Sequence, residues 1–153
     1  MESIEVLRKL RSNVLGLISE LSTEQLNKIP DGFNNNIVWN LGHIIAAQQG
    51  VCYKRAGLDT IVSEEFFESY RPGTKPQKFV DAEEIEHIKE LLFSTLDRFE
   101  ADAQKGIFTA YTPVVTRYGV ELTNITDAVN FLPFHDGFHM GYMMALRRLI
   151  NRD

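Results

Sequence analysis

Residues 132–144 read LPFHDGFHMGYMM, a stretch that places His135 and His139 one helical turn apart. Steps of three and four residues through the surrounding sequence trace one largely apolar helical stripe: Ala128, Leu132, His135, His139, Tyr142, Leu146 and Leu149. Both imidazoles are therefore predicted to face a protein core, where each ring must find a polar partner. Side chains four residues apart on a helix also lie close enough to bind one cation together.

The composition indicates a single domain with a buried core, covering residues 1–153. The net charge is −5 and no basic run is longer than a pair, which argues against nucleic acid as a partner. No apolar run approaches the ~20 residues that span a bilayer, and the N-terminus does not read as a signal peptide. The single cysteine, Cys52, cannot form an internal disulfide. We therefore expect a soluble, cytoplasmic protein that does not bind membranes.

The hydrophobic periodicity predicts an all-α fold, a four-helix bundle with very little sheet. We expect the helices over residues 2–21, from Asn35 or Asn36 to Ala56, over residues 81–104, and from the end of segment 123–127 to about Asn151. Asp81 suits the N-cap of the third helix, and Gly57 suits the C-terminal stop of the second. Ser22 and the residues after it indicate a short additional turn.

Two of the predicted connections are too long for a simple up-down bundle. About two dozen residues join the second and third helices, and residues 106–123 join the third and fourth. Both exceed the roughly 2–8 residues that are usual between bundle helices, so a topology with long crossover connections is expected. Residues 114–119, Val-Val-Thr-Arg-Tyr-Gly, combine β-prone side chains with a turn signal and predict a short hairpin at one end of the bundle.

A third histidine, His43, lies on the predicted second helix among mostly small residues: Trp39, Asn40, Ala46, Ala47 and Gly50. Small neighbours leave room for another helix or for a cavity. Taken alone, His43 reads as a core histidine bonded to a carbonyl group. Together with the His135 and His139 pair, it completes a set of three inward imidazoles. His87 differs, because it lies among glutamates away from the apolar face and is predicted to be solvated.

Three neutral imidazoles with one or more waters form the open coordination site of a catalytic metal. We predict that His43, His135 and His139 bind one divalent transition metal, zinc or nickel in first place, with iron and manganese also compatible. Such an ion lowers the pKa of water to about 7 or deprotonates a thiol. Glu84 and His87 formally match a di-iron motif, but the second helix lacks the inward carboxylates that this site needs.

Two sequence elements together resemble the DinB-like superfamily of metal-binding four-helix bundles. These are Trp39-Asn-Leu-Gly-His43-Ile on the second helix and His135-Asp-Gly-Phe-His139-Met-Gly on the last. The resemblance implies a DinB/YfiT-like fold, His43, His135 and His139 as metal ligands, and a homodimer. Similar proteins include transferases that join low-molecular-weight thiols to electrophiles. Asp136 stands where the family often has glutamate.

Two hypotheses of different classes follow. The first is a metal-dependent enzyme acting on a small molecule, a thiol S-transferase or a hydrolase, in which the ion activates a thiolate or water. The second is a non-catalytic metal-binding or ligand-binding bundle, with a stress-related role as one option. Candidate contacts near the ion or substrate are Asn40, Tyr53, Tyr142, Arg147 and Arg148. Cys52 is predicted to be an inert buried residue, and Met140, Met143 and Met144 to belong to the core or a dimer interface.

Overall fold

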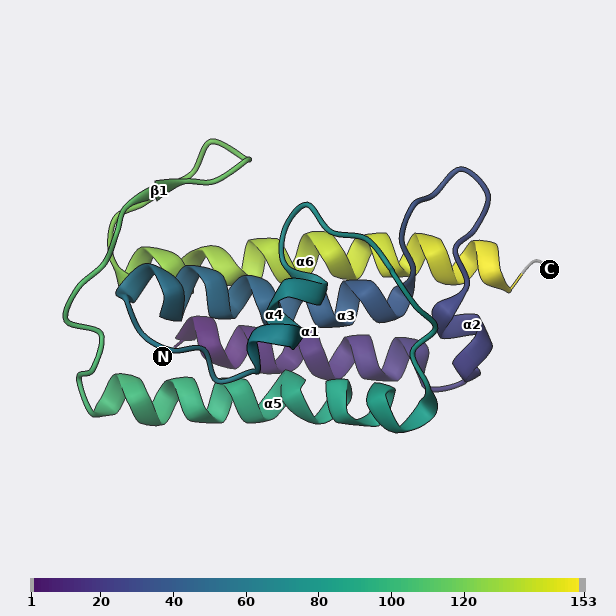
Figure 1. Ribbon diagram of the computed structural model, residues 1–153, viewed down its shortest axis with the longest axis horizontal. Helices are drawn as coiled ribbons and strands as arrows, with labels where there is room; N and C mark the ends of the chain where they lie inside the picture. The colour runs from purple at the N-terminus through teal and green to yellow at the C-terminus, as the bar shows by residue number, and fades with distance from the viewer. Residues whose placement is uncertain (1, 152–153) are drawn as a thin grey trace.

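The computed structural model describes residues 2–151, and within them it is dominated by four long helices (Figure 1). These are α1 (Glu2–Ile18), α3 (Ile37–Gln48), α5 (Ala82–Gln104) and α6 (Ile125–Ile150). Helix α3 continues as a π-helical segment (Gln49–Tyr53) and a 3₁₀ turn (Lys54–Ala56). The remaining described elements are the short helices α2 (Thr23–Asn27) and α4 (Glu64–Tyr70) and an antiparallel pair of strands, β1 (Val114–Val115) and β2 (Glu121–Leu122). The predicted all-α bundle is confirmed.

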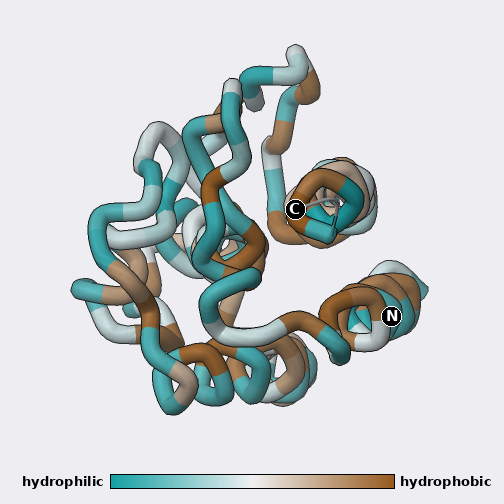
Figure 2. The backbone as a smooth tube through the Cα atoms, turned by 90° about the vertical axis from the view of Figure 1, so that its right-hand side faces the viewer, coloured by the Kyte–Doolittle hydropathy of each residue, from teal (hydrophilic) through white to brown (hydrophobic). Residues whose placement is uncertain are grey.

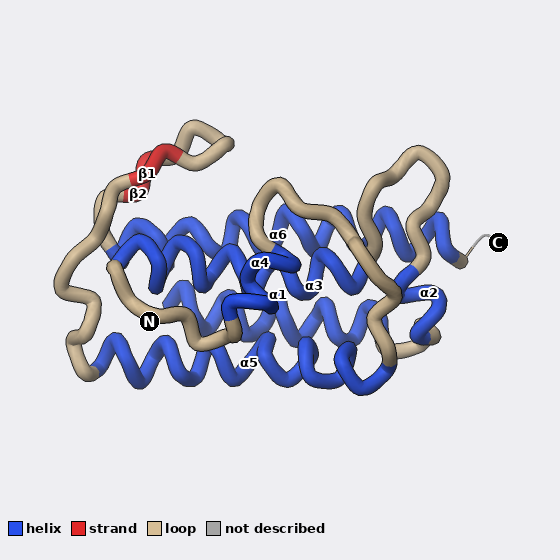
Figure 3. Tube along the Cα trace, in the orientation of Figure 1, coloured by secondary structure: helices blue, strands red, loops and turns tan. Residues whose placement is uncertain are grey.

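The long connections give the bundle its topology. Helices α1 and α6 run in one direction and α3 and α5 in the other (Figure 1). Seen along their length, the helices lie side by side (Figure 2). The chain between α3 and α5 must therefore return along the length of the bundle, and it does so with α4 packed against α3. The connection between α5 and α6 starts and finishes at the same end of the bundle, and it carries the predicted hairpin, which leans back over α6 (Figure 3). None of the described helices is long and apolar enough to cross a membrane.

Capping side chains explain where the helices begin. Asn36 accepts a hydrogen bond from the Trp39 amide, and Asp81 accepts one from Glu84, as their positions predicted. The last helix begins at Ile125, earlier than predicted, because Asn124 serves as its N-cap. At the end of the second helix Gly57 takes a left-handed conformation, with φ 73°, and stops the helix as predicted.

Two further features differ from the sequence prediction. The first helix ends at Ile18 and not at Leu21, because Ser22 forms a capping box with Gln25 and starts α2. The second difference is α4, which was expected to be part of a loop. Its seven residues are too few to show a helical period, although Ser63 caps it through the Phe66 amide.

The apolar core of the described chain consists of two clusters at opposite ends of the bundle. One joins the start of α1 to the end of α5 and the start of α6, with members Ile4, Leu7, Cys52, Tyr53, Leu96, Phe99, Ala128, Val129 and Leu132. The other contains residues from the opposite halves of the same long helices, among them Val14, Ile45, Ile88 and Leu146. This arrangement fits the helix directions, and it leaves the middle of the bundle for polar groups.

Helix α4 docks onto α3 at a glycine. A Cβ atom built at Gly42 would overlap the aromatic ring of Tyr70, so only glycine allows the close approach. Gly16 on α1 has open space where a Cβ would lie. The two helical glycines therefore form a matched pair for substitution.

We predict that Gly42→Ala lowers the free energy of unfolding by about 1–3 kcal/mol, because Tyr70 and α4 must move. Gly16→Ala is expected to raise it by about 0.5–1 kcal/mol through helix propensity. Denaturant unfolding of both variants and the wild type measures the difference. Equal changes in the two variants would contradict the close packing of α4 on α3.

Candidate metal centre

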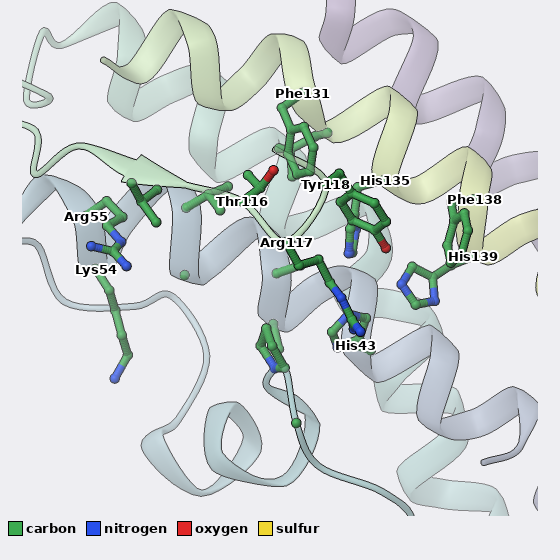
Figure 4. A pocket seen from close by; sticks show the side chains of 18 of the residues that line it. His43, Lys54, Arg55, Thr116, Arg117, Tyr118, Phe131, His135, Phe138 and His139 are labelled. Atoms are coloured by element: carbon green, nitrogen blue, oxygen red, sulfur yellow. The ribbon is translucent and has the colours of Figure 1, made fainter. Parts of the chain in front are cut away.

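The three histidines predicted to be inward come together at one point between α3 and α6. The ring centroids of His43 and His139 are 4.6 Å apart, as are those of His135 and His139, and His43 and His135 are 5.2 Å apart. One potential ligand atom from each residue lies within 4.8 Å of the other two. All three side chains are buried, with 5–9% of their surface exposed. Figure 4 shows them facing one another at one side of a pocket.

Hydrogen bonds fix the proton position on two of the rings. The Nδ1 atom of His43 lies 2.8 Å from the backbone oxygen of Tyr70, which can only accept, so Nδ1 carries the proton. The Nδ1 atom of His139 lies 2.8 Å from Oδ1 of Asn40. The amide group of Asn40 donates to the Asn36 carbonyl, so its oxygen faces His139 and accepts. In both rings Nε2 therefore keeps its lone pair and can serve as a metal ligand.

Burial keeps these two imidazoles neutral at physiological pH. Desolvation is the main cause, and it lowers the pKa of His43 to about 4 and that of His139 to about 3. The positive charge of Arg117 lowers both values further. Neutral imidazole is the form that binds metal, so protons compete weakly for the site near pH 7.

The third ring, His135, lies in front of a buried ion pair. Arg11 on α1 and Asp136 on α6 are 0% and 2% exposed, and Nε of Arg11 is 2.9 Å from Oδ2 of Asp136. Burial alone would raise the pKa of Asp136, but the charge and hydrogen bond of Arg11 and the contact with His135 hold it below its ordinary value. Asp136 is therefore a carboxylate, and it forms an ion pair with Arg11.

Two complementary atoms face each other at this point. Nδ1 of His135 and Oδ1 of Asp136 are 3.8 Å apart, and both are buried without a hydrogen-bond partner in the described structure. A shift of less than 1 Å would bring them to hydrogen-bonding distance, at roughly 2.7–3.2 Å. A carboxylate that accepts from the outer nitrogen of a ligating histidine orients the ring and makes it a better ligand.

A cavity of about 710 Å³ opens over the three histidines. Its lining includes Trp39, whose indole stacks on His43 at 4.6 Å with an interplanar angle of 13°. The predicted contacts Asn40 and Tyr142 line it as well. The charged side chains that line it are Lys54, Arg55 and Arg117, and the described lining contains no aspartate or glutamate.

Several sequence candidates lie elsewhere. Tyr53 does not reach the cavity, because its hydroxyl is buried and donates to Asp102 on α5 at 3.0 Å. Arg147 and Arg148 lie near the end of α6 and are not among the residues that line the cavity. Cys52 is fully buried and burial raises the pKa of its thiol, as expected for an inert residue.

The remaining sequence predictions concern His87 and the methionines of α6. His87 is exposed on α5, as predicted. Met143 is a core residue, Met140 is half-buried against the core, and Met144 is exposed.

Three residues at the site were not predicted from sequence. Arg11 occupies the helical stripe between Leu7 and Val14, and a charged residue within that stripe was the available signal. Tyr70 contributes only its backbone oxygen, which no side-chain pattern reveals. Arg117 comes from the hairpin between α5 and α6, and its position depends on how that hairpin folds back over the bundle.

These features define a four-helix-bundle protein with a candidate three-histidine metal centre at the base of an open cavity. The family model described as the DinB superfamily matches residues 7–143, and the chain belongs to that superfamily. The fold is also similar to a crystal structure titled as a conserved protein of locus from Enterococcus faecalis, with a TM-score of 0.59 and 15% identity. That alignment covers 99% of this chain and 96% of the other, and it supports the fold alone. No curated protein matches the chain.

We predict that Asp136→Asn lowers the free energy of unfolding by about 3–5 kcal/mol, because it leaves the Arg11 charge buried without its counterion. Asp97→Asn is the matched control, since Asp97 pairs with Arg8 at the surface and is 65% exposed. The control should lose less than about 1 kcal/mol. Denaturant unfolding measures both changes, and similar losses in the two variants would rule out an ionised buried pair.

A pH dependence follows from the lowered pKa values of the metal-free protein. Below pH 6.5 the unfolded chain takes up protons on His43 and His139, whereas the folded chain does so only near about 4 and about 3. The free energy of unfolding should therefore fall as the pH drops from 6.5, by up to about 1.4 kcal/mol per pH unit for each imidazole. Urea unfolding after EDTA treatment tests this. In His139→Gln the free energy of unfolding should change less steeply with pH than in wild type. An unchanged pH dependence would refute the lowered pKa of His139.

Proposed function

We propose that this protein is a divalent-metal-dependent enzyme in which His43, His135 and His139 hold one transition-metal ion. The observation that carries the proposal is the convergence of three buried imidazoles at the base of a cavity large enough for a small molecule. An ion that only supports a fold is normally enclosed by four protein ligands. Here three ligands and an open cavity leave room for a substrate.

The residues present fit such an ion. Two rings keep an Nε2 lone pair because Tyr70 and Asn40 accept from Nδ1, and the third faces an unpartnered carboxylate oxygen. All-nitrogen donor sets suit zinc and nickel, and iron and manganese also accept imidazole. When bound, the ion would lower the pKa of a coordinating thiol or water and so supply a nucleophile near neutral pH.

We further propose a thiol S-transferase or a hydrolase as the reaction class. The resemblance to thiol-using members of the superfamily favours a low-molecular-weight thiol as one substrate. The chain's own contribution is orientation and exclusion of water. Trp39 is buried and stacks on His43, so it shields that ring from water. Phe138 lies beside His139, with 5.6 Å between the ring centroids. Such an apolar wall strengthens electrostatic interactions at the site.

The expected result for purified, untagged wild-type protein is about one equivalent of a transition metal. His135→Ala and His139→Ala should each lose it, whereas His87→Ala should keep it, because His87 is exposed on α5. Elemental analysis measures the metal. The loaded wild type should also accelerate either the displacement of chloride from 1-chloro-2,4-dinitrobenzene by a thiolate or the hydrolysis of 4-nitrophenyl acetate. Both His→Ala variants should lose this activity.

Two outcomes would contradict the proposal in different ways. A His139→Ala variant that retains metal as tightly as wild type would remove His139 from the ligand set. Metal that binds and raises the unfolding midpoint without any turnover over a broad panel of thiols, electrophiles and esters would support the non-catalytic alternative. Circular dichroism of each variant separates loss of metal from loss of fold.

A further inference from the structure

We propose that the cavity over the three histidines takes a small organic anion, and that Arg117 binds its carboxylate, sulfonate or phosphate group beside the metal centre. The inference deepens the proposed function and rests on it, since it treats this cavity as the substrate site. It is carried by the placement of one guanidinium and by the absence of acidic groups from the described lining.

The hairpin between α5 and α6 delivers Arg117 to this position. Arg117 and Tyr118 form the tip of a tight turn, in which the Gly119 amide donates to the Thr116 carbonyl at 2.9 Å. Gly119 has φ 77°, a conformation that glycine adopts without strain. In Figure 4 the Arg117 side chain extends from this turn towards His43.

Tyr118 holds the tip of the hairpin on α6. Its ring lies over a row of aromatic side chains, with centroid distances of 6.3 Å to Phe131, 5.3 Å to Phe134 and 5.6 Å to Phe138. Aromatic pairs at this separation are stabilising. The contacts orient the turn so that the preceding residue, Arg117, projects over the histidines.

The positive charge in the cavity is not neutralised locally. Lys54 forms an ion pair with Glu64 at 2.9 Å and lies over the Phe67 ring. In contrast, neither Arg55 nor Arg117 has an ion pair or side-chain hydrogen bond among the interactions of the described residues. The chain as a whole has a net charge of −5, so this cavity has the opposite sign to the rest of the protein. Such a local field favours entry of anions.

The rest of the lining indicates an apolar body for the ligand. Trp39, Phe67, Phe131 and Phe138 all contribute to the walls. A guanidinium forms two parallel hydrogen bonds to a carboxylate or phosphate, and it does so more strongly where water is excluded. An acid with an aromatic or aliphatic body can contact the apolar walls and pair with the Arg117 guanidinium. A cation or a fully polar ligand cannot do both.

The test uses two fluorescent probes that differ only by a sulfonate group. 8-Anilino-1-naphthalenesulfonate carries it, and N-phenyl-1-naphthylamine lacks it. For metal-free protein, Arg117→Gln should weaken binding of the sulfonate probe about tenfold and leave the neutral probe unchanged. Arg148→Gln is the matched control, because it removes the same charge from an exposed site outside the cavity lining. It should leave both affinities within twofold of wild type.

Displacement of the sulfonate probe distinguishes the anionic groups. Benzoate and phenyl phosphate should compete, and the one with the lower inhibition constant identifies the preferred oxyanion, while neutral benzamide should compete at least tenfold less well. Equal affinity of Arg117→Gln and wild type for the sulfonate probe would overturn the proposal, as would equal losses in Arg117→Gln and Arg148→Gln. Because the titrations use metal-free protein, they are independent of the elemental analysis that tests the proposed function.

Discussion

The buried Arg11–Asp136 ion pair is the interaction on which the rest of the bundle depends. The guanidinium also donates to the side chain of Gln48 at 3.1 Å and to the backbone oxygen of Leu92 at 2.7 Å. Together with Thr95, which donates to Gln48, these groups form one polar layer with a contribution from every long helix. Since a charge removed from water without partners costs several kcal/mol, the four helices are stable only in the alignment that brings these groups together.

This layer links the alignment of the helices to the geometry of the candidate metal centre. Asp136 adjoins His135 in the chain, so the contact that neutralises Arg11 also places a carboxylate oxygen 3.8 Å from Nδ1 of His135. Helix α1 carries none of the three histidines, yet through Arg11 it holds the part of α6 that carries two of them. The apolar clusters on either side of the layer keep water away from it. Fold stability and the placement of the histidines therefore depend partly on the same atoms.

The features predicted correctly from the sequence are those with a local periodic cause. The spacing of His135 and His139, the small neighbours of His43 and the caps at Asn36 and Asp81 all act within one or two helical turns. What could not be predicted depends on contacts between distant segments. Helix α4 is too short to show a period, and the role of Tyr70 depends on its close approach to Gly42. The position of Arg11 in the apolar stripe indicates that its charge is buried. It does not indicate the partners, because they come from three other helices.

The proposed metal ligands and the proposed anion-binding residue lie on different kinds of structure. The three histidines lie on α3 and α6, whose positions are set by the core, whereas Arg117 lies at the tip of a hairpin held by Tyr118. A change in the hairpin alters the charge over the cavity and leaves the polar layer and the imidazoles in place. Loops on a rigid scaffold commonly carry specificity in this way. The three histidines that could hold a metal are therefore positioned by the helical scaffold, whereas the proposed contact with the substrate lies in the hairpin and the cavity walls.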